Sequence, residues 1–173
     1  GAGVTIVEHM DRVGKKILST GNGRCNLTNK EMRPEIFRGE HPEIVQSVLK
    51  QFSMEDTLEF FGQMGVAFTD RNGWVYPRSN QAKCIPELML LKARSLKVKI
   101  KTREKVKDVY QQNGRWKVQT EGWTYEGDRV ILANGSGASQ VPGSDGSGYA
   151  IAEKLGHRII KPLPALTGLR CKG

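Results

Sequence analysis

The chain has 173 residues, of which 38% are hydrophobic and 26% charged, a composition typical of one soluble globular domain. No apolar run approaches the roughly 20 residues of a membrane span, so a membrane protein is not expected. The cysteines and histidines show no metal-ligand spacing, which predicts free thiols in a reducing cytoplasm and no metal site. These residues are Cys25, Cys84, Cys171, His9, His41 and His157.

The net charge of +9 has two interpretations, and much of the excess lies within residues 92–107. In the segment 97–101, "KVKIK", lysines alternate with Val98 and Ile100, the period of a half-exposed strand. Lysines of this kind protect the edge of a sheet from aggregation. A nucleic-acid surface is the alternative, but no base-reading motif supports it, and a small anionic ligand explains a basic surface equally well.

The first half of the chain predicts one strand, a polar loop, helices and a hairpin. Ser53 is placed to cap a helix that carries Glu55 and Asp56 in its first turn. Asn72-Gly73 is a strong hairpin signal, and Pro86 predicts a kink or a helix start. The expected elements are a strand at 3–8, helices at 41–52 and 53–65, a hairpin at 66–77 and a helix at 79–96.

From residue 97 the pattern changes to strands. Asn113-Gly114 predicts a second hairpin, and the apolar segment 129–133 predicts a buried strand that enters a glycine-rich turn. A helix should follow over 147–157, with Ser147 as its N-cap and Gly156 at its end. The expected strands cover 97–102, 105–112, 115–121 and 123–133. This order indicates an α/β nucleotide-binding scheme in which an antiparallel β-meander precedes the last strand.

Two features at predicted strand ends suggest a ligand site. Glu8 closes the first strand, where dinucleotide folds place an acid that accepts hydrogen bonds from a ribose, although most strands that end in glutamate have no such role. The segment 130–137, "VILANGSG", ends a buried strand in a Gly-x-Gly turn. Open α/β sheets bind ligands at this edge, but a purely structural turn is equally compatible with the pattern.

The loop at 18–29, "LSTGNGRCNLTN", is compatible with a phosphate cradle, a thiol site or an ordinary polar loop. Its glycines allow backbone N–H groups to approach a phosphate or a flat ring, and Lys15, Lys16 and Arg24 supply positive charge. The loop is not a Walker P-loop. Cys25 as a nucleophile would need a base, and no histidine lies near it in the sequence.

Together these motifs resemble the BaiN-like (aminoacetone-oxidase-like) family of bacterial NAD(P)/FAD-dependent oxidoreductases. The matching segments are "GKKILSTGNGRCNLTN", "WVYPRSNQA", "VILANGSGAS" and "DGSGYAIAEKLGH". The resemblance implies a partial Rossmann-like FAD-binding domain of the glutathione-reductase type, with a helical insert and an antiparallel β-meander. It departs from the family at three positions: Asn22 replaces a glycine, Asn134 a threonine and Ser147 an aspartate.

The resemblance also implies a cofactor site. Glu8 would hold the adenosine ribose with Lys15 and Lys16 beside it, the GRCN residues would line the pyrophosphate and flavin, and Val106 would contact adenine through its backbone. Asn134 and Gly135 would lie near the adenosine end. The implied site residues are Glu8, Lys15, Lys16, Gly23, Arg24, Cys25, Asn26, Val106, Asn134 and Gly135. No catalytic acid or base is assigned.

The family pattern begins with a strand and GxGxxG, whereas this sequence begins at the second strand, so we expect a fragment in which residues 1–173 form one partial domain. Its expected parts are 1–29 (second strand and GRCN loop), 30–96 (helical and hairpin insert), 97–128 (strand and meander), 129–161 (strand, glycine turn and helix) and 162–173 (exit linker). Strands 3–8 and 129–133 should pair directly, or a strand from another chain should fill the gap between them and cause self-association.

The expected function of the intact parent is hydride transfer between NAD(P)H and a small organic substrate, with FAD as cofactor, although FAD retention by the fragment alone is in question. The alternatives are a non-catalytic module that binds nucleotides or polyanions, and an inactive structural fragment. No specific nucleic acid or membrane partner is expected, and the expected location is cytoplasmic.

Overall fold

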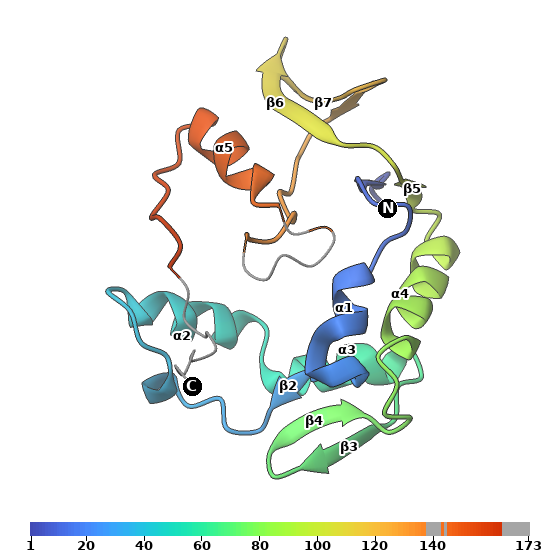
Figure 1. The fold of residues 1–173 in the computed structure, drawn as a ribbon, viewed down its shortest axis with the longest axis vertical. Helices are drawn as coiled ribbons and strands as arrows, with labels where there is room; N and C mark the ends of the chain where they lie inside the picture. The colour runs from blue at the N-terminus through green and yellow to red at the C-terminus, as the bar shows by residue number, and fades with distance from the viewer. Residues whose placement is uncertain (138–142, 144, 164–173) are drawn as a thin grey trace, which may run out of the picture. The chain divides into compact units, whose positions relative to one another are not determined.

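The computed structural model describes residues 1–137, 143 and 145–163, and the chain folds as two units (Figure 1). The first unit comprises residues 1–4 and 14–99, and the second comprises residues 5–13 and 100–173. Most of the expected exit linker, including Cys171, lies outside the described residues. The two units are described separately below.

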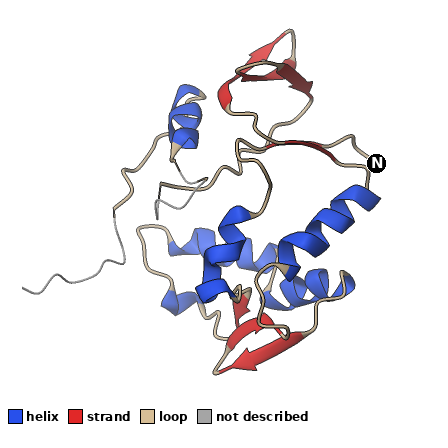
Figure 2. Cartoon of the chain, turned by 45° about the vertical axis from the view of Figure 1, so that its right-hand side comes forward, coloured by secondary structure: helices blue, strands red, loops and turns tan. Residues whose placement is uncertain are grey.

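The first unit is mainly helical, with one small sheet (Figure 2). Its helices are α1 (Lys15–Ser19), the 3-10 turns η1 (Thr20–Gly23) and η2 (Pro34–Ile36), α2 (Pro42–Gln51), α3 (Met54–Gln63) and α4 (Cys84–Ser95). Its sheet has the antiparallel order β2-β4-β3, formed by β2 (Thr28–Asn29), β4 (Trp74–Pro77) and β3 (Phe68–Arg71). Asn72 and Gly73 form the hairpin turn with φ of 54° and 86°, as the sequence predicts.

A small core holds the first unit together. It includes part of the loop at 18–29, called the GRCN loop after its residues Gly23, Arg24, Cys25 and Asn26. Cys25, Val66, Ala82 and Ile85 are buried, and six partly buried side chains pack against them. These are Ile17, Leu27, Phe61, Phe68, Cys84 and Leu88. The loop is therefore anchored by apolar packing as well as by backbone hydrogen bonds.

In the first unit, residues close to each helix start explain where the helix begins. At α3, the Ser53 hydroxyl accepts the Asp56 N–H and the Asp56 carboxylate accepts the Ser53 N–H, which completes the predicted cap. The helix expected from Ser79 begins later, at Cys84, so Pro86 lies in its first turn, where a missing N–H is tolerated. A Cβ at Gly14 would lie 2.7 Å from the Cβ of Pro86, so this tight approach excludes a side chain there.

The second unit contains most of the strand residues and one helix. β1 (Thr5–Val7) and β5 (Lys99–Lys101) form a two-stranded sheet, and β6 (Val106–Gln112), β7 (Arg115–Thr120) and β8 (Thr124–Gly127) form a sequential antiparallel sheet. Asn113 and Gly114 form the expected turn, with φ of 52° and 74°. Lysines on β6 and β7 pair with acids: Lys107 with Glu121 and Lys117 with Glu126.

α5 (Ser147–Lys154) follows the glycine-rich turn, and its start differs from the prediction. Gly146, not Ser147, occupies the N-cap position, and the Asp145 carboxylate accepts the Ser147 N–H at 3.0 Å. Gly156, with φ of 92°, lies just beyond the helix end, as predicted. The first residue of the helix thus receives its cap from an aspartate outside it.

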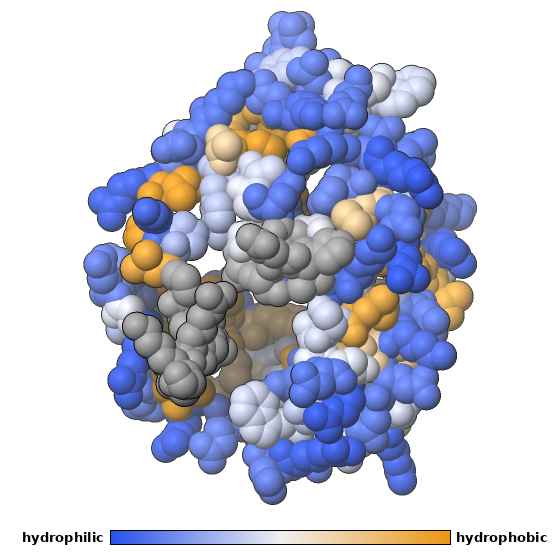
Figure 3. Space-filling model, in the orientation of Figure 1, coloured by the Kyte–Doolittle hydropathy of each residue, from blue (hydrophilic) through white to orange (hydrophobic). Residues whose placement is uncertain are grey.

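The prediction that segment 129–133 is a strand is wrong. Of the two expected ways to complete the sheet, direct pairing of this segment with β1 is not found, because β1 pairs with β5, and a strand from another chain stays a prediction. Ile131 is 87% exposed, and Leu132 is 39% exposed. The physical reason is that an apolar sequence becomes a strand only where another strand offers it N–H and C=O groups, and the described part of this chain offers none here. Hydrophobic side chains therefore remain on the surface of the protein (orange in Figure 3).

We predict that Ser53→Ala lowers the free energy of unfolding by about 1 kcal/mol, because the replacement leaves the Asp56 N–H of α3 without its side-chain acceptor. Urea denaturation followed by circular dichroism measures the change. Ser47→Ala in the middle of α2 is the control and should change stability by less than about 0.5 kcal/mol. Equal effects of the two substitutions would show that the cap does not stabilise the protein.

Candidate functional site

The GRCN loop of the first unit has an unusual backbone. Four of its residues have left-handed φ angles: 54° at Gly21, 53° at Asn22, 79° at Gly23 and 59° at Cys25. Asparagine tolerates this region better than most residues, so Asn22 can replace the family's glycine. The turn is closed by hydrogen bonds from the Cys25 N–H to the Thr20 carbonyl (3.0 Å) and from the Arg24 N–H to the Gly21 carbonyl (3.2 Å).

The two glycines of the loop differ in what surrounds them. A Cβ at Gly21 would lie 2.8 Å from the Asn26 backbone nitrogen, so only glycine fits. At Gly23 the nearest atom would be the Leu18 carbonyl oxygen at 4.0 Å. Gly23 therefore presents an open stretch of backbone, and it borders a hollow of about 340 Å³ lined by Leu18, Gly23, Gln81, Ala82 and Lys83.

Arg24 is held in place by two contacts. Its Nε–H donates to the Gly21 carbonyl at 3.3 Å, and its guanidinium lies over the Tyr76 ring, 5.5 Å from the ring centre. A stacked guanidinium of this kind is pre-organised for planar, charged hydrogen bonds. Arg24 is thus a fixed positive group beside the glycine turn.

Cys25 lies inside the core, with only 5% of its surface exposed. Burial raises the pKa of its thiol, a hydrogen bond with Thr20 opposes this shift, and the neighbouring Cys84 adds to it. Because the thiolate is the nucleophile, a buried thiol with a raised pKa is unsuited to attack. The geometry favours a lining and packing residue over a nucleophile.

Asn26 carries an unusual polar atom. Its Oδ1 is buried and, among the described side chains that are not exposed, it is the buried N or O atom without a hydrogen-bond partner. Such an atom is costly to leave unpaired. An N–H donor from a flat ring or another ligand would satisfy it, so a cofactor at this loop is compatible with the residues present.

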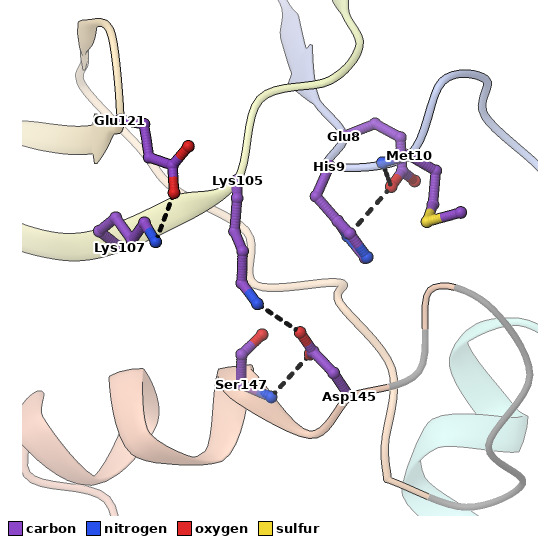
Figure 4. Close-up of polar contacts among 8 residues, drawn as sticks. All are labelled: Glu8, His9, Met10, Lys105, Lys107, Glu121, Asp145 and Ser147. Carbon is purple, nitrogen blue, oxygen red and sulfur yellow. Dashed lines mark hydrogen bonds and ion pairs between the residues drawn. The ribbon is translucent and has the colours of Figure 1, made fainter.

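The second unit holds the other predicted site residues. Glu8 directly follows β1, and its Oε1 accepts the Met10 N–H at 2.8 Å (Figure 4). Val106 begins β6, opposite Thr120. Asn134 and Gly135 are exposed, and the Asn134 side chain lies against Gly148 at the start of α5: a Cβ there would be 1.6 Å from Asn134 Nδ2.

The predicted residues therefore fall into two groups. Those of the first unit lie on α1 and the loop that follows it: Lys15, Lys16, Gly23, Arg24, Cys25 and Asn26. Those of the second unit are Glu8, Val106, Asn134 and Gly135. Their role in cofactor binding remains a prediction.

Sequence reasoning missed two groups in the second unit. Asp145 accepts the Ser147 N–H at 3.0 Å and the Lys105 ammonium at 2.9 Å (Figure 4). Hydrogen bonding by the Ser147 side chain, by Lys105 and by the Ser147 N–H draws the pKa of the Asp145 carboxyl well below the usual range. A carboxylate is thus present at the start of α5 although Ser147 stands where the family has an aspartate. His9 was the other omission, and its position beside Glu8 was visible in the sequence.

No described helix has the length and apolarity needed to cross a membrane. The described residues also contain no group of three histidine, cysteine, aspartate or glutamate side chains arranged to hold a metal ion.

Comparison with known proteins identifies the class of this fold. The model of the HI0933-like protein Rossmann domain matches residues 1–172. The chain therefore belongs to this family of Rossmann domains, which agrees with the α/β nucleotide-binding scheme and the BaiN-like resemblance predicted from the sequence.

Three relatives match nearly the whole of this chain. The 3-dehydro-bile acid delta(4,6)-reductase of Clostridium scindens is 46% identical over 171 residues, which are 99% of this chain and 42% of that protein. The ribosomal RNA dihydrouridine synthases of Escherichia coli and Haemophilus influenzae are 25% and 27% identical, over 98% and 96% of this chain and 42% of each relative. The chain thus spans about two fifths of the length of these relatives. The solved structure of the Diels-Alderase PyrE3 is similar at 15% identity with a TM-score of 0.42, over 79% of this chain and 28% of that chain.

We predict that the Cys25 thiol reacts with a thiol reagent such as DTNB at least tenfold more slowly in the folded protein than in urea, because it is buried and its pKa is raised. A Cys84→Ser, Cys171→Ser background leaves Cys25 as the reporting thiol. Fast labelling of Cys25 in the native protein at neutral pH would contradict the lining role.

We also predict that Gly21→Ala lowers the free energy of unfolding by roughly 1–3 kcal/mol, since φ is 54° and the new Cβ meets the Asn26 nitrogen. Gly114→Ala is the matched control: φ is also positive, at 74°, but nothing lies within 4 Å of the added Cβ. Its cost should be limited to the backbone strain of about 1 kcal/mol. Equal losses would show that close packing at Gly21 is unimportant.

Proposed function

We propose that this chain is the FAD-binding portion of a flavin-dependent oxidoreductase. The observation that carries the proposal is the GRCN loop, where a left-handed turn exposes the Gly23 backbone, Arg24 is fixed beside it and Asn26 Oδ1 lacks a partner. Glu8, at the end of β1, is the position from which dinucleotide folds bind the ribose. The membership in a Rossmann-domain family supports a nucleotide cofactor.

In this proposal the predicted residues serve the two ends of the cofactor. The Glu8 carboxylate and the backbone of Val106 bind the adenosine end, for which Lys15 and Lys16 add positive charge and near which Asn134 and Gly135 are assigned. The residues of the GRCN loop bind the pyrophosphate and flavin. The Nη donors of Arg24 would meet a phosphate oxygen, because Nε and the guanidinium face are engaged by the chain itself. Bound flavin would supply the hydride chemistry.

The names of the relatives suggest the reaction class. A delta(4,6)-reductase acting on a 3-dehydro bile acid and a synthase of dihydrouridine both imply addition of two hydrogens to a carbon–carbon double bond conjugated with a carbonyl group. We propose the same class here: NAD(P)H is the reductant, bound flavin would deliver the hydride to the β-carbon, and a proton reaches the α-carbon. The 46% identity with the bile acid reductase favours a small organic substrate.

A polyanion substrate is the second candidate, favoured by a specific pattern. Basic residues occupy every second position from Lys97 to Lys107, and two relatives act on ribosomal RNA. Assays of the whole protein with NAD(P)H separate the candidates. Oxidation of the nicotinamide by a conjugated steroid ketone supports the small-molecule substrate, whereas dihydrouridine formation in ribosomal RNA supports the RNA substrate.

Flavin binding tests the main proposal. The whole protein should retain FAD, and Glu8→Gln should raise the FAD dissociation constant about tenfold, because a hydrogen bond to a charged acceptor is replaced by a neutral one. Titration followed by flavin fluorescence measures this. Glu43→Gln, an exposed change on α2, is the control. RNA binding that weakens with salt, together with no flavin binding, would support the polyanion module instead.

The proposal also includes a partner strand for segment 129–133. We propose that the exposed segment 129–133 is completed by a strand from outside the described residues, and that the 173-residue chain alone self-associates there. Ile131→Lys should then shift the chain towards monomer in light scattering, because Ile131 is 87% exposed. Leu163→Lys, at an exposed apolar residue outside this segment, is the control. An unchanged mass distribution for Ile131→Lys would contradict the proposal.

A further inference from the structure

His9 lies beside the carboxylate that the proposed function assigns to the ribose. Its Nδ1 is 3.3 Å from Oε1 of Glu8, and the same oxygen accepts the Met10 N–H at 2.8 Å (Figure 4). Both side chains are about 30% exposed, at 31% for His9 and 28% for Glu8. One carboxylate oxygen thus accepts a backbone hydrogen bond and contacts the imidazole, and the side chain reaches the surface.

The backbone around this pair is fixed by the chain opposite. The Glu8 N–H donates to the Lys101 carbonyl at 2.8 Å, and the Glu104 N–H donates to the Glu8 carbonyl at 3.0 Å. The Arg103 N–H donates to the Met10 carbonyl at 2.8 Å. Since the main chain is held on both sides, the direction of the Glu8 carboxylate depends on its side-chain torsions, which the two contacts at Oε1 restrict.

The His9 ring also lies near Gly143. A Cβ at Gly143 would lie 3.9 Å from Cε1 of His9, the ring carbon bonded to Nδ1, and 3.4 Å from Cγ of Met10. The absence of a side chain at Gly143 thus leaves room for the edge of the ring whose Nδ1 contacts Glu8.

We propose that His9 is a positioning residue for Glu8. The contact of its Nδ1 with Oε1, together with the Met10 N–H, holds the carboxylate so that Oε2 is directed to a ribose hydroxyl of the adenosine end. The inference rests on the proposed flavin function and adds a residue to it. The energetic basis is pre-organisation: a carboxylate already oriented loses less side-chain entropy when the nucleotide binds.

Two variants of nearly equal shape separate positioning from packing. His9→Asn keeps a donor close to the position of Nδ1, whereas His9→Leu has the same branching but no donor. The whole protein with each substitution is titrated with FAD, with ADP-ribose, which carries the adenosine end, and with FMN, which lacks it. We expect His9→Leu to weaken binding of FAD and ADP-ribose about tenfold and His9→Asn to remain within about threefold of the unchanged protein. Neither should alter FMN binding.

The outcomes distinguish this inference from the flavin proposal. If His9→Leu binds FAD as tightly as the unchanged protein, or if His9→Asn is as weak as His9→Leu, the positioning role is overturned while the flavin function stands. If the unchanged protein binds neither FAD nor ADP-ribose, both are overturned. Combining each variant with Glu8→Gln gives a further check, because the effect of His9→Leu should largely vanish once the carboxylate is gone.

Discussion

The first unit depends on one constraint: the GRCN loop must place Cys25 in the core and still expose its glycine backbone. Burying the thiol between α1 and α4 requires several consecutive left-handed residues, a costly conformation that only glycine and asparagine adopt readily. The packing of Cys25 against Val66, Ala82 and Ile85 offsets that strain. The same turn leaves Gly23 accessible and Asn26 Oδ1 unsatisfied. The segment that packs into the core is thus also the segment to which we assign cofactor binding.

In the second unit, the segment that follows β1 is held by backbone hydrogen bonds. Its backbone is tied to residues 101–104, so Glu8 is presented from a fixed main chain. At the start of α5, Asp145 receives both Lys105 and the Ser147 N–H, which stabilises that helix end with a carboxylate. Because the pKa of Asp145 is depressed, its stabilisation is complete above its unfolded pKa and is lost as the pH falls through the folded one.

Part of the positive charge of the chain lies in ion pairs and on the edge of a sheet. Lysines of β6 and β7 pair with acids on the neighbouring strand or just beyond its end, as in the pairs Lys117–Glu126 and Lys107–Glu121. Exposed pairs of this kind contribute little stability. The alternating lysines of β5 lie on a short strand that, among the described residues, pairs with β1, which agrees with the edge-strand interpretation.

The sequence by itself determined the local elements. Ser53 specified a helix start, the two Asn-Gly pairs specified hairpins, and the GRCN motif, with the acid at the end of the first strand, pointed to the Rossmann-domain family to which the chain belongs. These features depend on residues close in the chain, whose torsional preferences and short hydrogen bonds act without long-range help.

Tertiary structure alone decided the rest. Segment 129–133 has the composition of a buried strand, yet it remains unpaired because a strand depends on a partner's backbone, which local sequence cannot specify. The burial that makes Cys25 a poor nucleophile and the pairing of Asp145 with Lys105, 40 residues away, likewise arise from segments distant in the sequence. Such contacts exist only after the chain has folded, so their chemistry could be read only from the structure.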